Sequence, residues 1–386
     1  MAESDGCALR IVIKIGTSSL IGEDHGITCL SLSQIAATVE VLSALRRAGH
    51  HVVLVSSGAV GAGCQKLGLH GRPKSVVARQ ALASIGQVHL MGKYDLLFSS
   101  LGQKCAQVLL TYENFVDRDQ FLNAKNTFTE LFNLGCVPIV NENDCVGIQE
   151  LKADNDKLAG MVGNMIGADV VFLMTDVDGV YTANPFTDEN ATRIKFVDNI
   201  SALKEKCSLG DGEDSNWGTG GMSAKINAAG LAASLGVRAV IMSAEDVTKI
   251  KTYVEQQVRE KLEGIPCDFE FGTTFAHNSS PPIERKRWIR SLLRRGTIIV
   301  DDGASAAVSG YNTLFAAGCL RVEGNFDSFE AVSVVDKNGT EIACGLCNFS
   351  SDDLRKVLGM TSEETFNVMG TPGNVIERSN LDLTID

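Results

Sequence analysis

The stretch that decides the fold is residues 51–63, HVVLVSSGAVGAG, in which an apolar run passes directly into serines and glycines. The β-favouring residues 52–55 predict a buried parallel strand. Ser56, Ser57 and three glycines follow and predict a turn into a helix. A helix that begins this way presents free backbone N–H groups and a positive dipole end, which favour anions. Glycine-rich turns also exist only to let a helix pack closely, so the stretch alone leaves both interpretations open.

Further short apolar runs alternate with predicted helices on both sides of this stretch. We expect strands at residues 11–15, 107–111, 137–140, 170–174 and 237–242, the last of which ends the series. We expect helices at residues 31–48, 76–97, 119–134, 156–166 and 223–235, and a loop at 16–19. Near-continuous apolar strands that alternate with helices indicate an α/β fold, a three-layer αβα sandwich with a mainly parallel sheet. Ligands of such sheets bind at the carboxyl ends of the strands.

The character of the sequence changes after residue 275. Two prolines at positions 281 and 282 lie in a polar segment, which is typical of a linker. Short β-like runs follow, and Asn338-Gly339 predicts a hairpin with a type I′ turn. We therefore expect a larger domain over residues 8–275, a linker over 276–285, a small β-rich domain over 286–370 and a C-terminal tail over 371–386.

Composition narrows the class of protein. The net charge of −12 argues against a general nucleic-acid binder, which needs clustered lysine and arginine, but not against ATP. The 11 cysteines are scattered through apolar runs, as is usual for free thiols in a reducing compartment. Cys344 and Cys347 form a single C-x-x-C, which we interpret as strand residues. No apolar run reaches the length of a membrane span, so we expect a cytoplasmic protein without a membrane partner.

Two lysines have positions that suit phosphate. Lys14 lies in an apolar strand just before Gly16, where its ammonium group must reach solvent or serve an anion. Lys225 lies in the first turn of a predicted helix, where a cation opposes the helix dipole. Phosphate oxygens between the lysine and the helix terminus would remove that conflict.

Two acidic and amide-rich segments form a second group of candidates. Residues 141–144 (NEND) follow a strand, and residues 154–156 (DND) precede a helix. Such side chains can hold the ammonium and carboxyl groups of an amino acid, or Mg²⁺. The alternative is an Asx turn with a helix N-cap at Asp154 or Asn155. No P-loop, G-x-S-x-G motif or metal-binding histidine spacing is present, so metal ligands stay unassigned.

Six motifs in order carry a resemblance to a known family. They are VIKIGTSSL (12–20), VSSGAVGAG (55–63), VPIVNENDCV (137–146), DNDKLAG (154–160), LMTDVDGVYTANP (173–185) and GTGGMSAK (218–225). They resemble the glutamate 5-kinases of the amino acid kinase family, and RKRWI (285–289) with the β-rich end of the chain resembles a PUA domain. The resemblance implies ATP- and Mg²⁺-dependent phosphorylation of the γ-carboxylate of L-glutamate, the first step of proline biosynthesis. It also implies inhibition by L-proline and a homo-oligomer.

The resemblance assigns roles by motif position. It implies that ATP binds Lys14, Thr175, Asp176, Thr219, Gly220, Gly221, Met222, Ser223, Ala224 and Lys225, and that glutamate binds Ser57, Asp144 and Asn155. The lysines would neutralise transition-state charge, with Asp156 orienting them. A γ-carboxylate with a pKa of ~4.3 is already a nucleophile, so alignment and charge neutralisation suffice. Ala224 replaces a hydroxyl residue common in the family, which removes one possible phosphate hydrogen bond.

Two other functions compete with this interpretation. One is another kinase of the same family, acting on acetylglutamate, aspartate, carbamate or a nucleotide. The other is RNA binding through the PUA-like domain, suggested by the basic residues Arg285, Lys286, Arg287, Arg290, Arg294 and Arg295 with Trp288. A solvated basic surface is the simpler interpretation of that run, given the net acidity.

Overall fold

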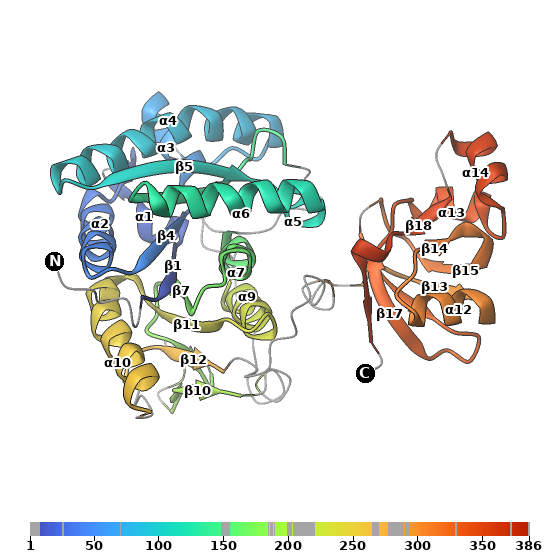
Figure 1. Cartoon of the computed structure of the whole chain (residues 1–386). Helices are drawn as coiled ribbons and strands as arrows, with labels where there is room; N and C mark the ends of the chain where they lie inside the picture. Colours follow the sequence, from blue (N-terminus) through green and yellow to red (C-terminus); the bar gives the residue numbers. More distant parts are fainter. Residues whose placement is uncertain are drawn as a thin grey trace. The chain divides into compact units, whose positions relative to one another are not determined.

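The structure is a computed structural model of the whole chain (Figure 1). It describes residues 8–24, 27–69, 71–147, 155–183, 185, 188, 190–198, 203, 221–264, 270–276, 289, 294–328, 330–370 and 373–384. The chain forms two compact units, Met1–Pro281 and Pro282–Asp386, and each has its own hydrophobic core. Within the described ranges, no helix is both long and apolar enough to cross a membrane.

The first unit is built on an eight-stranded sheet with the order β10-β12-β11-β7-β1-β4-β6-β5. The strands are β1 (Arg10–Ile15), β4 (His51–Ser56), β5 (Lys104–Leu110), β6 (Cys136–Glu142), β7 (Val170–Thr175), β10 (Phe196–Val197), β11 (Arg238–Ser243) and β12 (Thr273–Phe275). All neighbours run parallel except β11 and β12. The predicted mainly parallel sheet is confirmed.

Helices cover both faces of this sheet. They are α2 (Leu32–Arg47), α3 (Ala59–Leu67), α4 (Val76–Ser100), α6 (Arg118–Asn133), α7 (Asn155–Ile166), α9 (Met222–Ser234) and α10 (Ile250–Glu263). Figure 1 shows α2 and α10 on one side of the sheet and α7 and α9 on the other. Ile11 and Ile13 join the core beneath α2, α4 and α10. Because side chains alternate along a strand, Lys14 faces the opposite layer, where α7 packs on β1.

The glycines of the deciding stretch serve two purposes. Gly58 has a φ of +93° at the N-cap of α3, a conformation that other residues rarely adopt. A Cβ atom on Gly63 would lie 2.1 Å from the carbonyl oxygen of Leu82, and one on Gly86 would lie 1.7 Å from that of Ala59. Helices α3 and α4 therefore pack backbone against backbone. Both interpretations of the glycines, a special turn and close packing, apply here.

Three expectations for the first unit were wrong. Residues 16–19 do not form a loop, because a short helix, α1 (Thr17–Leu20), follows β1 and leads into a hairpin of β2 (Ile21–Asp24) and β3 (Ile27–Leu30). The strand series does not end at residue 242, since β12 and β10 extend the sheet. Helix α10 went unpredicted, although its buried residues 250, 253, 254 and 257 have helical spacing.

Smaller elements complete the first unit. They are α5 (Glu113–Val116), β8 (Val180–Tyr181), β9 (Arg193–Ile194) and a 3₁₀ helix, η2 (Ala244–Lys249).

The second unit has a five-stranded sheet with the order β15-β13-β16-β17-β19. Its strands are β13 (Gly296–Val300), β15 (Cys319–Gly324), β16 (Ala331–Val335), β17 (Glu341–Leu346) and β19 (Leu381–Leu383). A separate pair joins β14 (Leu314–Phe315) to β18 (Asn374–Ile376). The helices are α12 (Asp302–Ser309), α13 (Ser351–Val357) and α14 (Ser362–Met369), with 3₁₀ turns η3 (Ala316–Gly318) and η4 (Arg378–Asn380).

Two details of the second unit differ from expectation. The predicted tail, 371–386, instead contributes strands β18 and β19, and Ile376 and Leu381 are fully buried in the core. The Asn338-Gly339 hairpin exists, but only Gly339 has a positive φ, so the turn is not type I′. The Asp336 carboxylate instead accepts the backbone N–H groups of Asn338 and Thr340 at 2.9 and 2.8 Å. This Asx-type cap holds a longer loop.

Candidate active site

The candidate site lies where the parallel strands β1, β4, β6 and β7 end. Their carboxyl ends lie along one edge of the sheet because neighbouring strands run in the same direction. The ends of these strands and the segments after them contain half of the residues predicted from the motifs, which are Lys14, Ser57, Asp144, Asn155, Asp156, Thr175 and Asp176. The structure brings these residues to one edge from distant parts of the sequence.

A buried cluster of three charges lies at the centre of this edge. Lys14 Nζ, from the end of β1, lies 2.6 Å from Asp156 Oδ1 in the first turn of α7. Lys225 Nζ, from the first turn of α9, lies 3.5 Å from Asp156 Oδ2. The exposed fractions of Lys14, Asp156 and Lys225 are only 4%, 2% and 9%. One carboxylate thus serves two ammonium groups that three separate elements supply.

The electrostatics of the cluster favour the charged forms. Burial by itself raises the pKa of Asp156, but the nearby ammonium groups of Lys14 and Lys225 outweigh burial, so the pKa is lowered. Asp156 is therefore ionised at neutral pH, and two lysine side chains against one carboxylate give the cluster a formal excess of one positive charge. A buried excess of positive charge suits an anionic ligand.

A polar pair lies on neighbouring elements. Asn155 lies at the start of α7, and Ser57 directly follows β4. Asn155 Nδ2 donates a hydrogen bond to Ser57 Oγ at 3.1 Å. Asn155 Oδ1 is buried without a hydrogen-bond partner among the described residues. Ser57 is itself buried. The amide oxygen of Asn155 is therefore available for a donor from a ligand, such as an ammonium group.

Asn141 belongs to the predicted segment 141–144, although the sequence assigned it no role of its own. It is 4% exposed at the end of β6, and its Nδ2 has no hydrogen-bond partner within the described ranges. Its Oδ1 accepts the backbone N–H of Glu142 at 2.9 Å. An orphaned amide donor at this edge is suited to a carboxylate. Its position directly after an apolar strand was the available signal.

Asp144 lies in the turn that follows β6. The carbonyl oxygen of Asn143 accepts the N–H groups of Val146 and Gly147 and closes this turn. The N–H of Asn143 in turn donates to the carbonyl of Leu110 at 2.9 Å, which ties the turn to the end of β5. Asp144 is thus held at the same sheet edge as Ser57 and Asn155.

The predicted nucleotide segments divide between described and undescribed residues. Thr219 and Gly220 lie outside the described residues, whereas Gly221, Met222, Ser223 and Ala224 enter α9. Gly221 is the N-cap of α9 and no side chain caps this helix, so its first N–H groups can meet an anion. A Cβ atom on Gly16 would lie 3.6 Å from Lys14 Nζ, an ordinary contact distance, which places this residue directly beside the lysine.

Thr175 and Asp176 complete the predicted set. Thr175 ends β7 and is buried, and its hydroxyl donates to Asp176 Oδ1 at 2.8 Å. Because β7 pairs with β1 in parallel, both residues lie at the end of the strand beside that of Lys14.

The described residues do not form a metal site by themselves. No three metal-ligating side chains cluster within the part of the chain that the structure describes. Both oxygens of Asp156, the most buried carboxylate at this edge, face lysines. Mg²⁺ can still arrive with nucleotide phosphates, which supply several of its oxygen ligands in other proteins.

The basic residues near the second unit are partly neutralised. Arg294 pairs with Glu341 at 3.4 Å, and Arg295 pairs with Glu330 at 3.5 Å. The remaining basic residues of that run, at 285–287 and 290, lie outside the described residues, as does Trp288. The described arginines therefore give no support to a nucleic-acid surface.

Comparison with known proteins defines the class. The model of the amino acid kinase family matches residues 9–243, and the PUA domain model matches residues 296–369. The chain belongs to the amino acid kinase family and has a PUA domain at its C-terminal end. It is thus a kinase, as the motifs predicted.

Similar proteins within the family point to one kind of kinase. Glutamate 5-kinase of Nostoc punctiforme is 46% identical over 97% of this chain and 99% of its own length. Glutamate 5-kinase of Thermosynechococcus vestitus is 44% identical over 98% of this chain and 100% of its own length. The predicted resemblance to the glutamate 5-kinases is confirmed. Among solved structures, carbamate kinase from Giardia lamblia bound to AMP-PNP is 15% identical over 70% of this chain and 99% of that chain, with a TM-score of 0.46.

Proposed function

We propose that this protein transfers the γ-phosphoryl group of ATP to the γ-carboxylate of L-glutamate and so makes L-glutamyl 5-phosphate for proline biosynthesis. The observation that carries the proposal is the buried Lys14–Asp156–Lys225 cluster beside the Ser57–Asn155 pair. The full-length similarity to glutamate 5-kinases supports the choice of substrate.

The chemistry requires charge neutralisation and alignment. An oxygen of the γ-carboxylate forms a bond to the γ-phosphorus while the bond from phosphorus to the ADP oxygen breaks, and no proton needs to be removed. Charge develops on the phosphoryl oxygens and on the leaving ADP. Lys14 and Lys225 would stabilise that charge, and Asp156 keeps both ammonium groups in place before the nucleotide arrives.

The nucleotide and the amino acid would occupy different parts of the edge. ATP would contact Thr175, Asp176 and the uncapped start of α9 from Gly221 to Lys225, with Mg²⁺ bound to its phosphates. Glutamate would contact Ser57, Asp144 and Asn155. Asp144 and the orphaned Asn155 Oδ1 suit its ammonium group, and the orphaned Asn141 Nδ2 suits a carboxylate.

Trapping the product tests this proposal. The protein is incubated with Mg-ATP, hydroxylamine and one acid at a time: L-glutamate, N-acetyl-L-glutamate, L-aspartate or carbamate. An acyl phosphate gives a hydroxamate, which we expect in quantity only with L-glutamate. Formation of ADP with another acceptor, and none with L-glutamate, would reject the substrate and leave the family assignment intact.

L-proline is proposed as an inhibitor that competes with glutamate. Proline has the same α-carboxyl and α-amino groups but no γ-carboxylate, so residues that hold those shared ends can bind either molecule. The two ligands should exclude each other. Calorimetry tests this: proline binding undiminished by saturating glutamate would place the inhibitor at a separate site.

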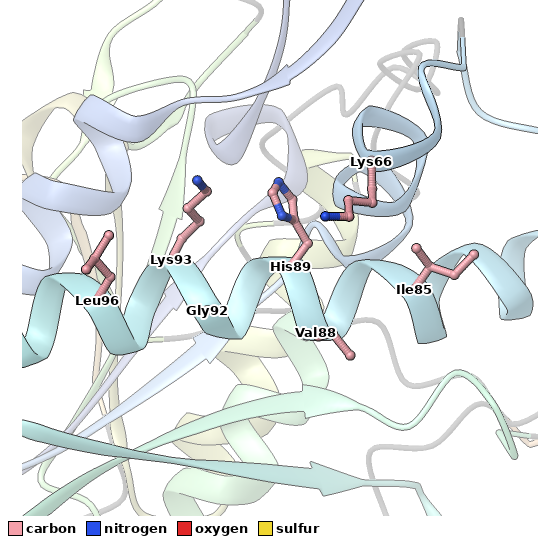
Figure 2. A pocket seen from close by; sticks show the side chains of 7 residues that line it. All are labelled: Lys66, Ile85, Val88, His89, Gly92, Lys93 and Leu96. Atoms are coloured by element: carbon pink, nitrogen blue, oxygen red, sulfur yellow. The ribbon is translucent and has the colours of Figure 1, made fainter.

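A homo-oligomer is proposed from the surface of α4. Leu82, Leu90 and Phe98 bury one face of this helix, yet Val88 and Leu96 on the opposite face are 78% and 62% exposed. A helix that is apolar on both faces is usually covered on both. Figure 2 shows the residues that line a pocket here, with His89 and Lys93 on the same side of α4 as Lys66 of α3.

A second copy is the proposed occupant of this surface. An antiparallel two-fold packing centred on Gly92 would set Val88 against Leu96 of the other copy, and His89 against its Asp95. Sedimentation of the Val88→Glu variant tests the proposal. We expect a smaller assembly than for the wild type, although the mass of a single chain is almost the same. An unchanged assembly would exclude this face.

A cytoplasmic location remains the proposal for the compartment. The described cysteines are all free thiols, the state that a reducing compartment maintains.

A further inference from the structure

A pair of arginines near the substrate edge is not used by the proposed mechanism. Arg72 lies in the segment between α3 and α4, and Arg79 lies in the first turn of α4. The Nε atoms of both side chains are buried and have no hydrogen-bond partner among the described residues. A buried N–H group without a partner is costly, so two of them together call for an explanation.

The backbone fixes where these arginines lie. Close contacts of Gly63 with Leu82 and of Gly86 with Ala59 lock α3 against α4 in an antiparallel arrangement. The Cys64 thiol of α3 lies 3.5 Å from the carbonyl oxygen of Gly71 and ties the connecting segment to α3. The residue before Arg72 is therefore attached to α3, which packs closely against α4.

The local charges are unbalanced. Burial and the charge of Arg79 lower the pKa of Arg72, whereas Asp144 and Cys64 raise it. The positive dipole end of the 25-residue helix α4 adds to the two guanidinium groups. Asp144 is a carboxylate that raises the pKa of Arg72. The group thus has an excess of positive charge beside Asp144.

An α-amino acid has the complementary charges. Its ammonium and carboxylate groups are attached to one carbon atom, so a site that grips both needs an anion and a cation close together. Asp144 supplies the anion, and Arg72 with Arg79 supplies the cation. A guanidinium group also matches a carboxylate with two parallel N–H donors.

We propose that Arg72 binds the α-carboxylate of the amino acid substrate and that Arg79 positions it. This inference rests on the proposed function, because it takes glutamate as the substrate. It makes Arg72 a specificity-determining residue: acids that have a γ-carboxylate but no α-carboxylate are rejected here. Arg79 acts through Arg72 and the start of α4 without touching the reacting atoms.

The test compares two acceptors in the wild type and in several variants. L-Glutamate and 4-aminobutyrate share the ammonium group and the acceptor carboxylate, and only glutamate has the α-carboxylate. Hydroxamate formation gives kcat/KM for each acceptor with the wild type, Arg72→Met and the control Lys74→Met. Lys74 is an exposed cation two residues from Arg72.

We expect Arg72→Met to lower kcat/KM for L-glutamate about 30-fold, mainly through KM, because a charge-assisted pair is lost. The value for 4-aminobutyrate should stay within about twofold, so that the preference for glutamate collapses. Lys74→Met should keep the preference of the wild type. Arg79→Lys should lower kcat/KM for L-glutamate less than Arg79→Met does.

Two results would overturn the inference. If Arg72→Met lowers kcat/KM equally for both acceptors, the role of Arg72 is structural. A lowered melting temperature of the variant would agree with that. If neither acceptor is affected, Arg72 does not contact the substrate. Failure of the proposed function looks different, since the wild type itself would then form no hydroxamate from L-glutamate.

Discussion

Lys14 Nζ lies 2.6 Å from Asp156 Oδ1, which joins the end of the central strand β1 to the first turn of α7. Both side chains are almost completely buried. Because β1 lies in the middle of the sheet, the ammonium group has a fixed position relative to the neighbouring strand ends. Lys225 approaches the other oxygen of the same carboxylate at 3.5 Å and completes a preformed positive site.

Replacing either lysine should affect the chemical step more than binding. We expect Lys14→Met and Lys225→Met each to lower kcat about 100-fold, because a preorganised charge that faces the transition state is lost. The KM for glutamate should change by less than about threefold. Steady-state kinetics on each variant measures both values. Lys157→Met, an exposed lysine next to Asp156 on α7, is the matched control. Near-normal kcat in a lysine variant would remove that lysine from the role.

Asp144 should matter for the amino acid and not for the nucleotide. Asp144→Ala should raise the KM for glutamate at least about tenfold, because the partner of the ammonium group is lost, while the KM for ATP changes little. Initial rates with each substrate varied in turn give the two constants. Equal increases in both would point to a general effect on folding instead.

Asp156 should contribute to stability in a pH-dependent way. Asp156→Asn leaves two buried ammonium groups without their anion, and we expect a loss of about 3 kcal/mol in the free energy of unfolding at pH 7. The folded pKa of Asp156 is lowered by its lysines, so the unfolded chain binds its proton first as the pH falls.

The wild type should therefore hold its full advantage over Asp156→Asn above pH ~4 and lose it as the pH falls further, through the folded pKa. Denaturant unfolding of both proteins at several pH values measures the difference. Asp198→Asn, at an exposed position after β10, serves as control. A difference that stays constant down to the lowest pH at which both proteins fold would contradict this account.

The second unit should be dispensable for phosphoryl transfer. Each unit has a separate core, and the described residues of the candidate site all belong to the first unit. A protein ending at residue 277 should fold and should phosphorylate glutamate with kcat within about fivefold of the full chain. Circular dichroism establishes the fold. A folded but inactive product would mean that the second unit completes the active site.

The central part of the fold could be predicted from sequence because its strands are continuous apolar runs with clear stops. Strand 52–55 and its turn appeared as β4, Gly58 and α3. Short elements were not predicted from the sequence. Helix α1 has four residues, which are too few for a periodic pattern. Strand β12 pairs antiparallel with β11 after a long separation in sequence. The C-terminal strand β19 was missed because its three residues gain their partner only through tertiary pairing.

The charged residues of the site could be predicted from the sequence, but its unsatisfied polar groups could not. Lys14, Asp156 and Lys225 could be linked through motif order, since each charge lies beside a glycine or a helix start. The sequence could not predict which polar groups lack a hydrogen-bond partner, because this becomes visible only after packing. The groups concerned are the amide of Asn141 and the Nε atoms of Arg72 and Arg79. Sequence reveals which groups are polar, and only the structure reveals which are left unsatisfied.

The central claim is that the γ-carboxylate itself attacks ATP at the Lys14–Asp156–Lys225 cluster. L-Glutamate with ¹⁸O in both γ-carboxyl oxygens tests this directly in the presence of Mg-ATP and hydroxylamine. Attack by hydroxylamine on the acyl carbon releases phosphate together with the bridging oxygen. The account predicts one ¹⁸O atom in each phosphate released, in amounts equal to the hydroxamate. Unlabelled phosphate would show that water, and not the carboxylate, accepts the phosphoryl group, and would contradict the account.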